Sequence, residues 1–128
     1  MHEPTTPRHS GVLRRVAHAH GAKRALNHVL ATMIDAVKNG AAGSWQLSNL
    51  GPKMLQGDFR PGFKVWHQQK DLRLALELAN QSSTPLTGTA LVHQLFAALE
   101  ADGQREAGTQ ALVKALEKLA NTTLAGDS

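Results

Sequence analysis

Two histidines near the start of the chain, His18 and His20, are of a residue type and spacing that could suggest a metal site. Imidazole nitrogens are common zinc ligands, but a zinc site needs several protein ligands that converge on one point. Side chains two residues apart on a helix point about 200° away from each other, and no third ligand follows at a usual spacing. The sequence therefore predicts no metal site.

The motifs of the common catalytic and nucleotide-binding sites are missing from the chain. No serine stands in a G-x-S-x-G turn, and the sequence contains neither G-x-G-x-x-G nor G-x-x-x-x-G-K-[ST]. A dinucleotide-binding fold also needs a strand before its glycine turn, and no strand pattern precedes any helix pattern here. The residues alone thus indicate a helical domain of unassigned role.

Composition favours helices packed on helices. The chain has 128 residues, of which 41% are apolar and only 4% aromatic, and it lacks both tyrosine and cysteine. Leu and Ala must therefore fill much of the core, and these residues suit helices better than sheets. No apolar run approaches the length of a membrane span. We expect a cytoplasmic protein that has no disulfides and does not bind membranes.

The positive charge of the chain is confined to its start. Residues 1–30 hold five basic side chains and one acidic side chain, which accounts for the whole net charge of +4, whereas residues 31–128 hold nine of each kind. A nucleic-acid-binding domain normally carries a basic face on its folded part. We therefore expect no nucleic-acid partner.

The chain divides into a basic leader, residues 1–30, and a helical domain, residues 31–128. The first 21 residues contain four histidines, two prolines and three arginines, with almost no apolar periodicity. Such a segment cannot bury enough surface to offset its chain entropy, so we expect disorder at least to Gly11. Arg-rich leaders are also typical of transit peptides. We favour a stretch that was never selected as protein, such as an upstream extension or a frame-shifted remnant.

Apolar periodicity predicts an all-α fold with four or five helices and no strands. Ser44 is the expected N-cap of the second helix, and Thr84 with Pro85 is expected to begin the fourth. Gly40 is expected to end the first helix in the left-handed conformation. The expected helices span about 22–39, 45–55, 64–81, 85–100 and 107–121. The fourth is expected to bury Leu91, Leu95, Phe96 and Leu99.

Short motifs follow one another between Asn39 and Leu76. They are G-A-A-G-S at 40–44, P-K-M-L at 52–55, D-F-R-P-G-F at 58–63 and K-D-L-R-L-A-L at 70–76, followed by P-L-T, A-D-G and A-L-V-K-A-L-E-K-L. In order and spacing they resemble the C-terminal domain of the beta-hydroxyacid dehydrogenases, which include 3-hydroxyisobutyrate dehydrogenase and tartronate semialdehyde reductase. The resemblance covers about residues 33–121. It implies a helical bundle like the C-terminal domain of the 6-phosphogluconate dehydrogenases.

The resemblance implies NAD or NADP as cofactor and gives three residues a place beside it. The lysine of the K-D-L motif, Lys70, would face the dinucleotide, where an ammonium can donate hydrogen bonds and offset negative charge. Asp71 would steady the helix start or the preceding loop, and Phe63 would lie close to the nicotinamide. The alternative for Lys70 is an ordinary solvated lysine paired with Asp71 or Glu77.

The catalytic position of the family departs from its pattern here. The family's catalytic lysine stands in a G-x-x-K-x-x-N-like segment and exchanges a proton with the substrate oxygen during hydride transfer. The nearest match is residues 21–27, where alignment on Asn27 places Arg24 at the lysine position. Arginine hardly gives up its proton. The remaining candidate, Lys23, is one residue and therefore about 100° out of register.

The resemblance places the Gly43-Ser44 turn at the floor of the substrate cleft. About twenty residues that the family has between its asparagine and this turn are missing here. Either the long central helix is cut short, or the match before Met33 is accidental, and we favour the second explanation.

Two functions of different classes follow. The first is the C-terminal half of an NAD(P)-dependent 3-hydroxyacid dehydrogenase, which acts on a small hydroxyacid and needs a Rossmann domain from a partner chain. The second is a non-catalytic helical oligomerisation module, or a truncated remnant of such an enzyme. In either case we expect a homo-oligomer or a heteromeric partner, and no dehydrogenase activity from this chain alone.

Overall fold

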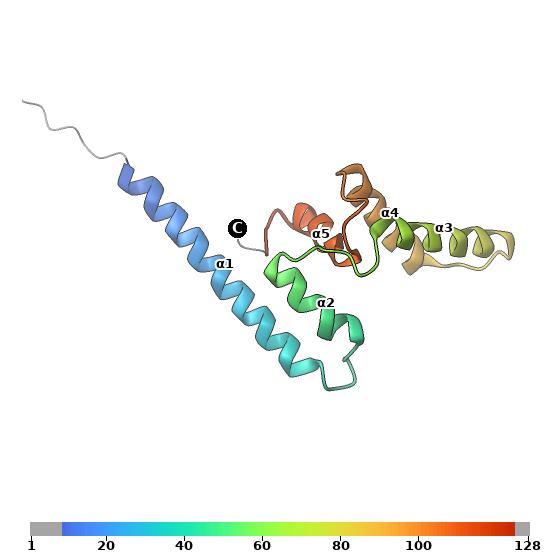
Figure 1. The fold of residues 1–128 in the computed structure, drawn as a ribbon, viewed down its shortest axis with the longest axis horizontal. Coiled ribbons are helices and arrows are strands. Elements are labelled where there is room, and N and C mark those ends of the chain that lie inside the picture. Colours follow the sequence, from blue (N-terminus) through green and yellow to red (C-terminus); the bar gives the residue numbers. More distant parts are fainter. Residues whose placement is uncertain (1–8, 125–128) are drawn as a thin grey trace, which may run out of the picture.

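The computed structural model describes residues 9–124, with side chains from residue 21 onward. These residues form five α-helices and one short 3₁₀-helix, joined by loops (Figure 1). No strand occurs within these residues, so the predicted all-α fold is confirmed. The helices are α1 His9–Val37, α2 Trp45–Gln56, α3 Val65–Gln81, α4 Thr87–Ala101, the 3₁₀-helix η1 Thr109–Leu112 and α5 Val113–Ala120.

The first helix is longer than its apolar periodicity predicts. It begins at His9 and continues without a break across residue 30. No proline follows Pro7 until Pro52, and alanine and arginine, both good helix formers, are frequent between residues 14 and 25. Residues 9–11, expected to be disordered, thus belong to α1, whereas residues 1–8 lie outside the described part. The division of the chain at residue 30 stays a prediction.

The core lies where α3, α4 and η1 meet. Its buried members are Val65, Phe96, Leu99 and Ala111. The short η1 helix packs against α2, α3, α4 and α5, so it joins all of the helices that follow α1. The predicted burial of Phe96 and Leu99 is confirmed, whereas Leu91 is 63% exposed and its predicted burial is wrong. The cause is that α4 meets α3 and α5 on other faces and leaves Leu91 uncovered.

Of the three residues predicted to cap or end a helix, Ser44 is right, and Thr84 and Gly40 are wrong. The Ser44 Oγ accepts a hydrogen bond from the Leu47 N–H at 3.0 Å and caps α2, as predicted. Thr84 does not cap α4, which begins after Leu86 without a side-chain cap. Its hydroxyl instead shares a 3.0 Å hydrogen bond with that of Ser82, which holds it in the preceding turn.

Among the described residues, the glycines in the left-handed conformation are Gly57 and Gly103, which follow α2 and α4 with φ of 69° and 76°. Gly40 is not among the residues with positive φ, so its predicted left-handed conformation is wrong. The chain after α1 instead closes through two successive turns, in which the Gly40 N–H donates to Val37 O and the Gly43 N–H donates to Gly40 O.

α1 and α2 form a pair that stands beside the rest of the fold. α2 lies along the second half of α1, whereas the first half of α1 extends past the other helices (Figure 1). Gly51 allows the close approach, because a Cβ atom there would lie 3.0 Å from Ile34 Cδ1. Within residues 9–124, none of the helices has both the length and the apolar character to cross a membrane. The cytoplasmic location stays a prediction.

Candidate functional site

The D-F-R-P-G-F motif forms a loop, residues 58–64, that we call the Phe63 loop. Asp58 begins it, and its carboxylate accepts hydrogen bonds from Arg60 Nε at 2.8 Å, from Arg60 Nη2 at 2.7 Å and from the Arg60 backbone N–H at 3.2 Å. These bonds hold the pKa of Asp58 well below its ordinary value and raise the pKa of Arg60. The start of the loop is thereby closed on itself.

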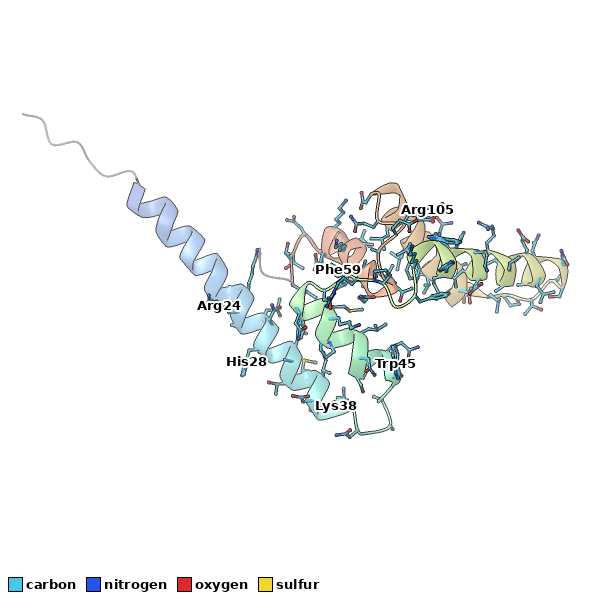
Figure 2. All side chains as sticks on the ribbon, viewed as in Figure 1. Arg24, His28, Lys38, Trp45, Phe59 and Arg105 are labelled. Carbon is cyan, nitrogen blue, oxygen red and sulfur yellow. The ribbon has the colours of Figure 1, made fainter. Side chains whose placement is uncertain are left out.

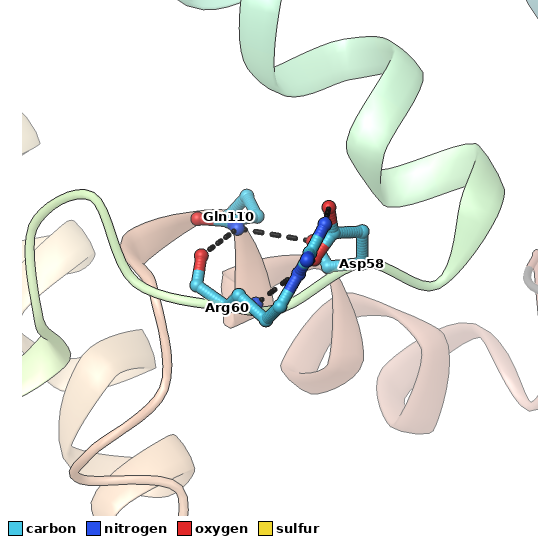
Figure 3. Close-up of polar contacts among 3 residues, drawn as sticks. All are labelled: Asp58, Arg60 and Gln110. Atoms are coloured by element: carbon cyan, nitrogen blue, oxygen red, sulfur yellow. Dashed lines mark hydrogen bonds and ion pairs between the residues drawn. The ribbon is translucent and has the colours of Figure 1, made fainter.

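The segment from Ala107 to Gln110 holds the Phe63 loop from its other side. The Gly108 N–H donates to Phe59 O at 2.9 Å and the Thr109 N–H donates to Phe63 O at 3.0 Å. The Gln110 Nε2 donates to two further loop carbonyls, those of Asp58 at 3.0 Å and Arg60 at 2.9 Å (Figure 3). The loop therefore directs much of its backbone polarity inward; Phe59 packs against the core, whereas residues 60–63 are exposed.

Phe63 and the first turns of α3 form an exposed face of aromatic rings and cations. The rings of Phe63 and His67 stack with centroids 5.4 Å apart, and the Trp66 and His67 centroids lie 3.6 Å apart. The Arg105 guanidinium lies 5.6 Å from the Trp66 ring centroid. Lys70 follows His67 by three residues and so lies on the same side of α3. We call Phe63, His67 and Lys70 the Phe63 face.

The charges of this face are open to solvent. The Lys70 ammonium lies 3.6 Å from Asp71 Oδ1, and both side chains are more than half exposed. Such an exposed ion pair contributes little stability. Beside it, Lys64 Nζ pairs with Glu106 Oε2 at 2.7 Å and lowers the pKa of that carboxyl group. The Lys70 ammonium can therefore exchange Asp71 for another anion at small cost.

The two predicted substrate residues do not lie on the Phe63 face. Gly43 and Ser44 precede α2, whereas the Phe63 loop follows it, so a helix about 18 Å long separates them. Figure 2 shows this separation, with Trp45 at one end of α2 and Phe59 beyond the other. The Ser44 hydroxyl caps α2, and a Cβ atom at Gly43 would stand 2.2 Å from Lys38 O. Both residues thus have structural roles, and their place in a substrate cleft stays a prediction.

The predicted catalytic residue, Lys23, lies on α1 away from the Phe63 face. With Ala22 and Leu26 it lines one side of a cavity of about 320 Å³, and the segment after α5, residues 121–123, lines the other. Asn27, one helical turn further on, has a buried side-chain oxygen without a hydrogen-bond partner. Because α1 packs chiefly on α2, the structure does not bring Lys23 and Lys70 together.

Two buried polar side chains escaped prediction. Within residues 9–124, no three His, Cys, Asp or Glu side chains lie close enough to hold a metal ion. Two glutamines, however, are almost fully buried: Gln69 between α3 and α4, and Gln110 behind the Phe63 loop. Apolar periodicity did not predict their burial, because a glutamine is expected at the surface unless its hydrogen-bond partners are known.

The described part of the chain is thus an all-α domain that carries a face of aromatic and basic side chains. A family model described as "NAD-binding of NADP-dependent 3-hydroxyisobutyrate dehydrogenase" matches residues 16–116. The chain therefore belongs to the 3-hydroxyisobutyrate dehydrogenase family. The match also extends into the segment before Met33, whose similarity we attributed to accident.

Several curated proteins share this similarity. The chain is 42% identical over 91 residues to the "Probable 3-hydroxyisobutyrate dehydrogenase-like 1, mitochondrial" of Arabidopsis thaliana, covering 71% of this chain and 27% of that protein. It is 41% identical over 90 residues to the 2-hydroxy-3-oxopropionate reductase of Escherichia coli (strain K12), covering 70% and 31%. An uncharacterized oxidoreductase of Bacillus subtilis (strain 168) is 45% identical over 82 residues, covering 64% and 28%. The chain thus spans less than a third of these relatives' length.

Proposed function

We propose that this chain is the helical domain of an NAD(P)-dependent 3-hydroxyacid dehydrogenase and contributes a cofactor contact and part of the substrate cleft. Family membership supports the class of enzyme. The observation that carries the cofactor contact is the Phe63 face, where an exposed ring and an exposed ammonium lie on one side of α3. NAD and NADP offer matching groups, a flat nicotinamide and anionic phosphates.

Each residue of the face has a defined task in this proposal. The Lys70 ammonium binds an anionic or oxygen acceptor of the cofactor, which replaces Asp71 as its partner. The Phe63 ring, 45% exposed, packs on the nicotinamide and keeps water from it. His67 supports the Phe63 ring from behind. The cofactor supplies the hydride chemistry, and these side chains orient it.

The proposal requires a dinucleotide-binding domain from outside these 128 residues, since they contain no glycine-rich phosphate motif. The proposal also states that the chain forms a homo-oligomer. Supporting this, the apolar stripe on α1 is exposed over four residues in one register, Leu26, Val29, Met33 and Val37. An oligomerisation module without catalytic use explains that stripe equally well, but it leaves the Phe63 face without a purpose.

Titration of the ¹⁵N-labelled chain with NAD and with NADP tests the cofactor contact. Shifts should concentrate on Phe63, His67 and Lys70, because these groups would meet the ligand. Replacement of Lys70 by Ala should weaken binding about tenfold, the effect of one charge-assisted hydrogen bond.

Lys118→Ala is the matched control, because Lys118 is an exposed lysine on α5 that also pairs with an aspartate, Asp102. It removes the same net charge away from the Phe63 face. If both variants weaken cofactor binding equally, the effect is due to net charge alone, which contradicts the proposal. A spectrum that does not change when NAD or NADP is added would also contradict the proposal.

A further inference from the structure

Gln110 is buried to a degree unusual for an amide side chain. It is 1% exposed, and it lies on η1 between the core and the Phe63 loop. An amide that leaves water without compensating hydrogen bonds destabilises the fold. Here the Nε2 group donates to the carbonyls of Asp58 and Arg60, at 3.0 and 2.9 Å. One side chain therefore bridges two carbonyls that lie two residues apart on a loop about fifty residues away in the sequence.

These two bonds depend on the residue type, unlike the others that hold the loop. The Gly108 and Thr109 N–H groups also donate to loop carbonyls, but any non-proline residue supplies a backbone N–H. Of the common side chains that fit this volume, a neutral carboxamide offers two hydrogens on one nitrogen. Figure 3 shows the Gln110 carboxamide hydrogen-bonded to the backbone carbonyls of Asp58 and Arg60.

A glycine two residues before Gln110, Gly108, leaves the room that the Gln110 carboxamide needs. A Cβ atom on Gly108 would stand 2.3 Å from Gln110 Oε1 and 2.8 Å from Nε2. Any other residue at position 108 would displace the carboxamide from the two carbonyls. The position of the Gln110 carboxamide therefore depends on glycine at position 108.

We infer that Gln110 is a positioning residue for Phe63: it fixes the Phe63 loop, and so the ring, before a ligand arrives. This role rests on the proposed cofactor contact. The loop has no helix or strand of its own and contains Gly62, so an unheld loop would lose conformational entropy on binding. With its carbonyls anchored by η1, the loop presents Phe63 in one place.

Hydrogen exchange of the full chain tests the inference, with Gln110→Met as the variant. Methionine keeps the length of the side chain but removes the donor. The Gly108 and Thr109 amides, which donate to the loop, should then exchange faster by a factor of roughly 5–30, the effect of one or two lost hydrogen bonds. Gln69→Met is the matched control, because Gln69 is also a buried glutamine with two polar partners, His93 and Glu100, but lies between α3 and α4.

Gln110→Glu adds a readout that loss of packing alone would not produce. A carboxylate there would face two carbonyls without a hydrogen to give, whereas its protonated form can donate one. Burial raises the pKa of such an acid. The amide shifts of Phe63 should therefore return toward the wild-type positions as pH falls from about 8 to about 5. They should show no such return in Gln110→Met.

The outcomes separate this inference from the proposed function. If the wild-type spectrum does not change with either cofactor, the proposed cofactor contact is wrong. The hydrogen-exchange rates still decide the role of Gln110. Exchange at Gly108 and Thr109 that is no faster in Gln110→Met than in Gln69→Met overturns the inference. If Gln110→Met does not fold, Gly108→Ala and Gln110→Glu carry the test: unchanged Phe63 shifts in Gly108→Ala, or no acid recovery in Gln110→Glu, overturn it equally.

Discussion

The α1–α2 pair and the region from residue 58 to residue 120 are stabilised in different ways. No described residue before Val65 is buried as a whole, and α1 leaves much of its apolar stripe exposed. The later region has a buried core, and polar contacts tie its loop to η1 across about fifty residues. The later region thus has the interactions of a folded domain, whereas α1 has one helix to pack on.

The difference indicates where a partner surface is needed. An exposed apolar stripe on a long helix is stable in water when another surface covers it. The Phe63 face, in contrast, lies on the region with its own core, and its geometry is set without a partner. We therefore expect cofactor contact to depend on residues 58–120 and assembly to depend on α1.

The largest expected effect separates two leucines that differ in burial. Leu99 is fully buried, so Leu99→Ala should lower the free energy of unfolding by about 2–5 kcal/mol. Leu26 on α1 is 39% exposed, so Leu26→Ala should cost less than about 1 kcal/mol. Urea unfolding followed by circular dichroism measures both values.

The dependence of stability on protein concentration separates the two variants further. If α1 pairs with a second copy of the chain, the cost of Leu26→Ala should rise with concentration, because assembly stabilises the folded state by mass action. The cost of Leu99→Ala should rise less. A Leu26→Ala variant as unstable as Leu99→Ala at every concentration would show that α1 is already buried within one chain, and the contrast between the two regions would be wrong.

A smaller effect is expected at the turn between α1 and α2. A Cβ atom at Gly43 would stand 2.2 Å from the backbone oxygen of Lys38, which cannot move aside without the helix end. Gly43→Ala should therefore destabilise the pair by about 1–3 kcal/mol. Gly40→Ala is the control within the same turn, since its Cβ atom would meet Val37 O at an ordinary 3.6 Å.

The two tryptophans allow the effect of Gly43→Ala to be located. Trp45 begins α2 and Trp66 lies in α3, so their indole N–H signals report the two regions separately. Only the Trp45 signal should broaden or shift early in urea. Early loss of both signals would mean that the α1–α2 pair and the core unfold as one unit. If Gly43→Ala changes neither the stability nor the Trp45 signal, a purely functional role for that glycine is favoured instead.

The sequence predicted the parts of the fold that depend on local chemistry. The cap at Ser44 follows from residue type, and Phe96 and Leu99 follow from the apolar register of the helix. The motifs around Phe63 and Lys70 also identified the family. Their assigned roles stay predictions.

Two of the missed features, the exposure of Leu91 and the burial of Gln110, depend on distant contacts, whereas the extension of α1 depends on helix propensity. Leu91 has the register of a core residue, but α3 and α5 meet α4 elsewhere, and nothing in α4 itself reveals this. The continuation of α1 to His9 needed helix propensity to prevail without an apolar face. Gln110 needed partners about fifty residues away, and no local pattern places a glutamine beneath a loop. Pattern reading therefore finds elements and motifs more readily than the contacts that hold them in place.

The smallest expected effect lies at the boundary of the two regions, where Asp58 follows α2. Hydrogen bonds from Arg60 lower the pKa of Asp58, so this pair stabilises the fold above the ordinary aspartate pKa. This contribution should fall progressively as the pH drops from the ordinary aspartate pKa to the lowered value. A ¹³C carboxyl titration should place Asp58 well below an ordinary aspartate. Arg60→Gln should return it most of the way, because the backbone N–H of residue 60 still donates. Equal midpoints in both proteins would mean that the exposed guanidinium does not hold the carboxylate in solution, and the boundary would then depend on Gln110 and the backbone bonds alone.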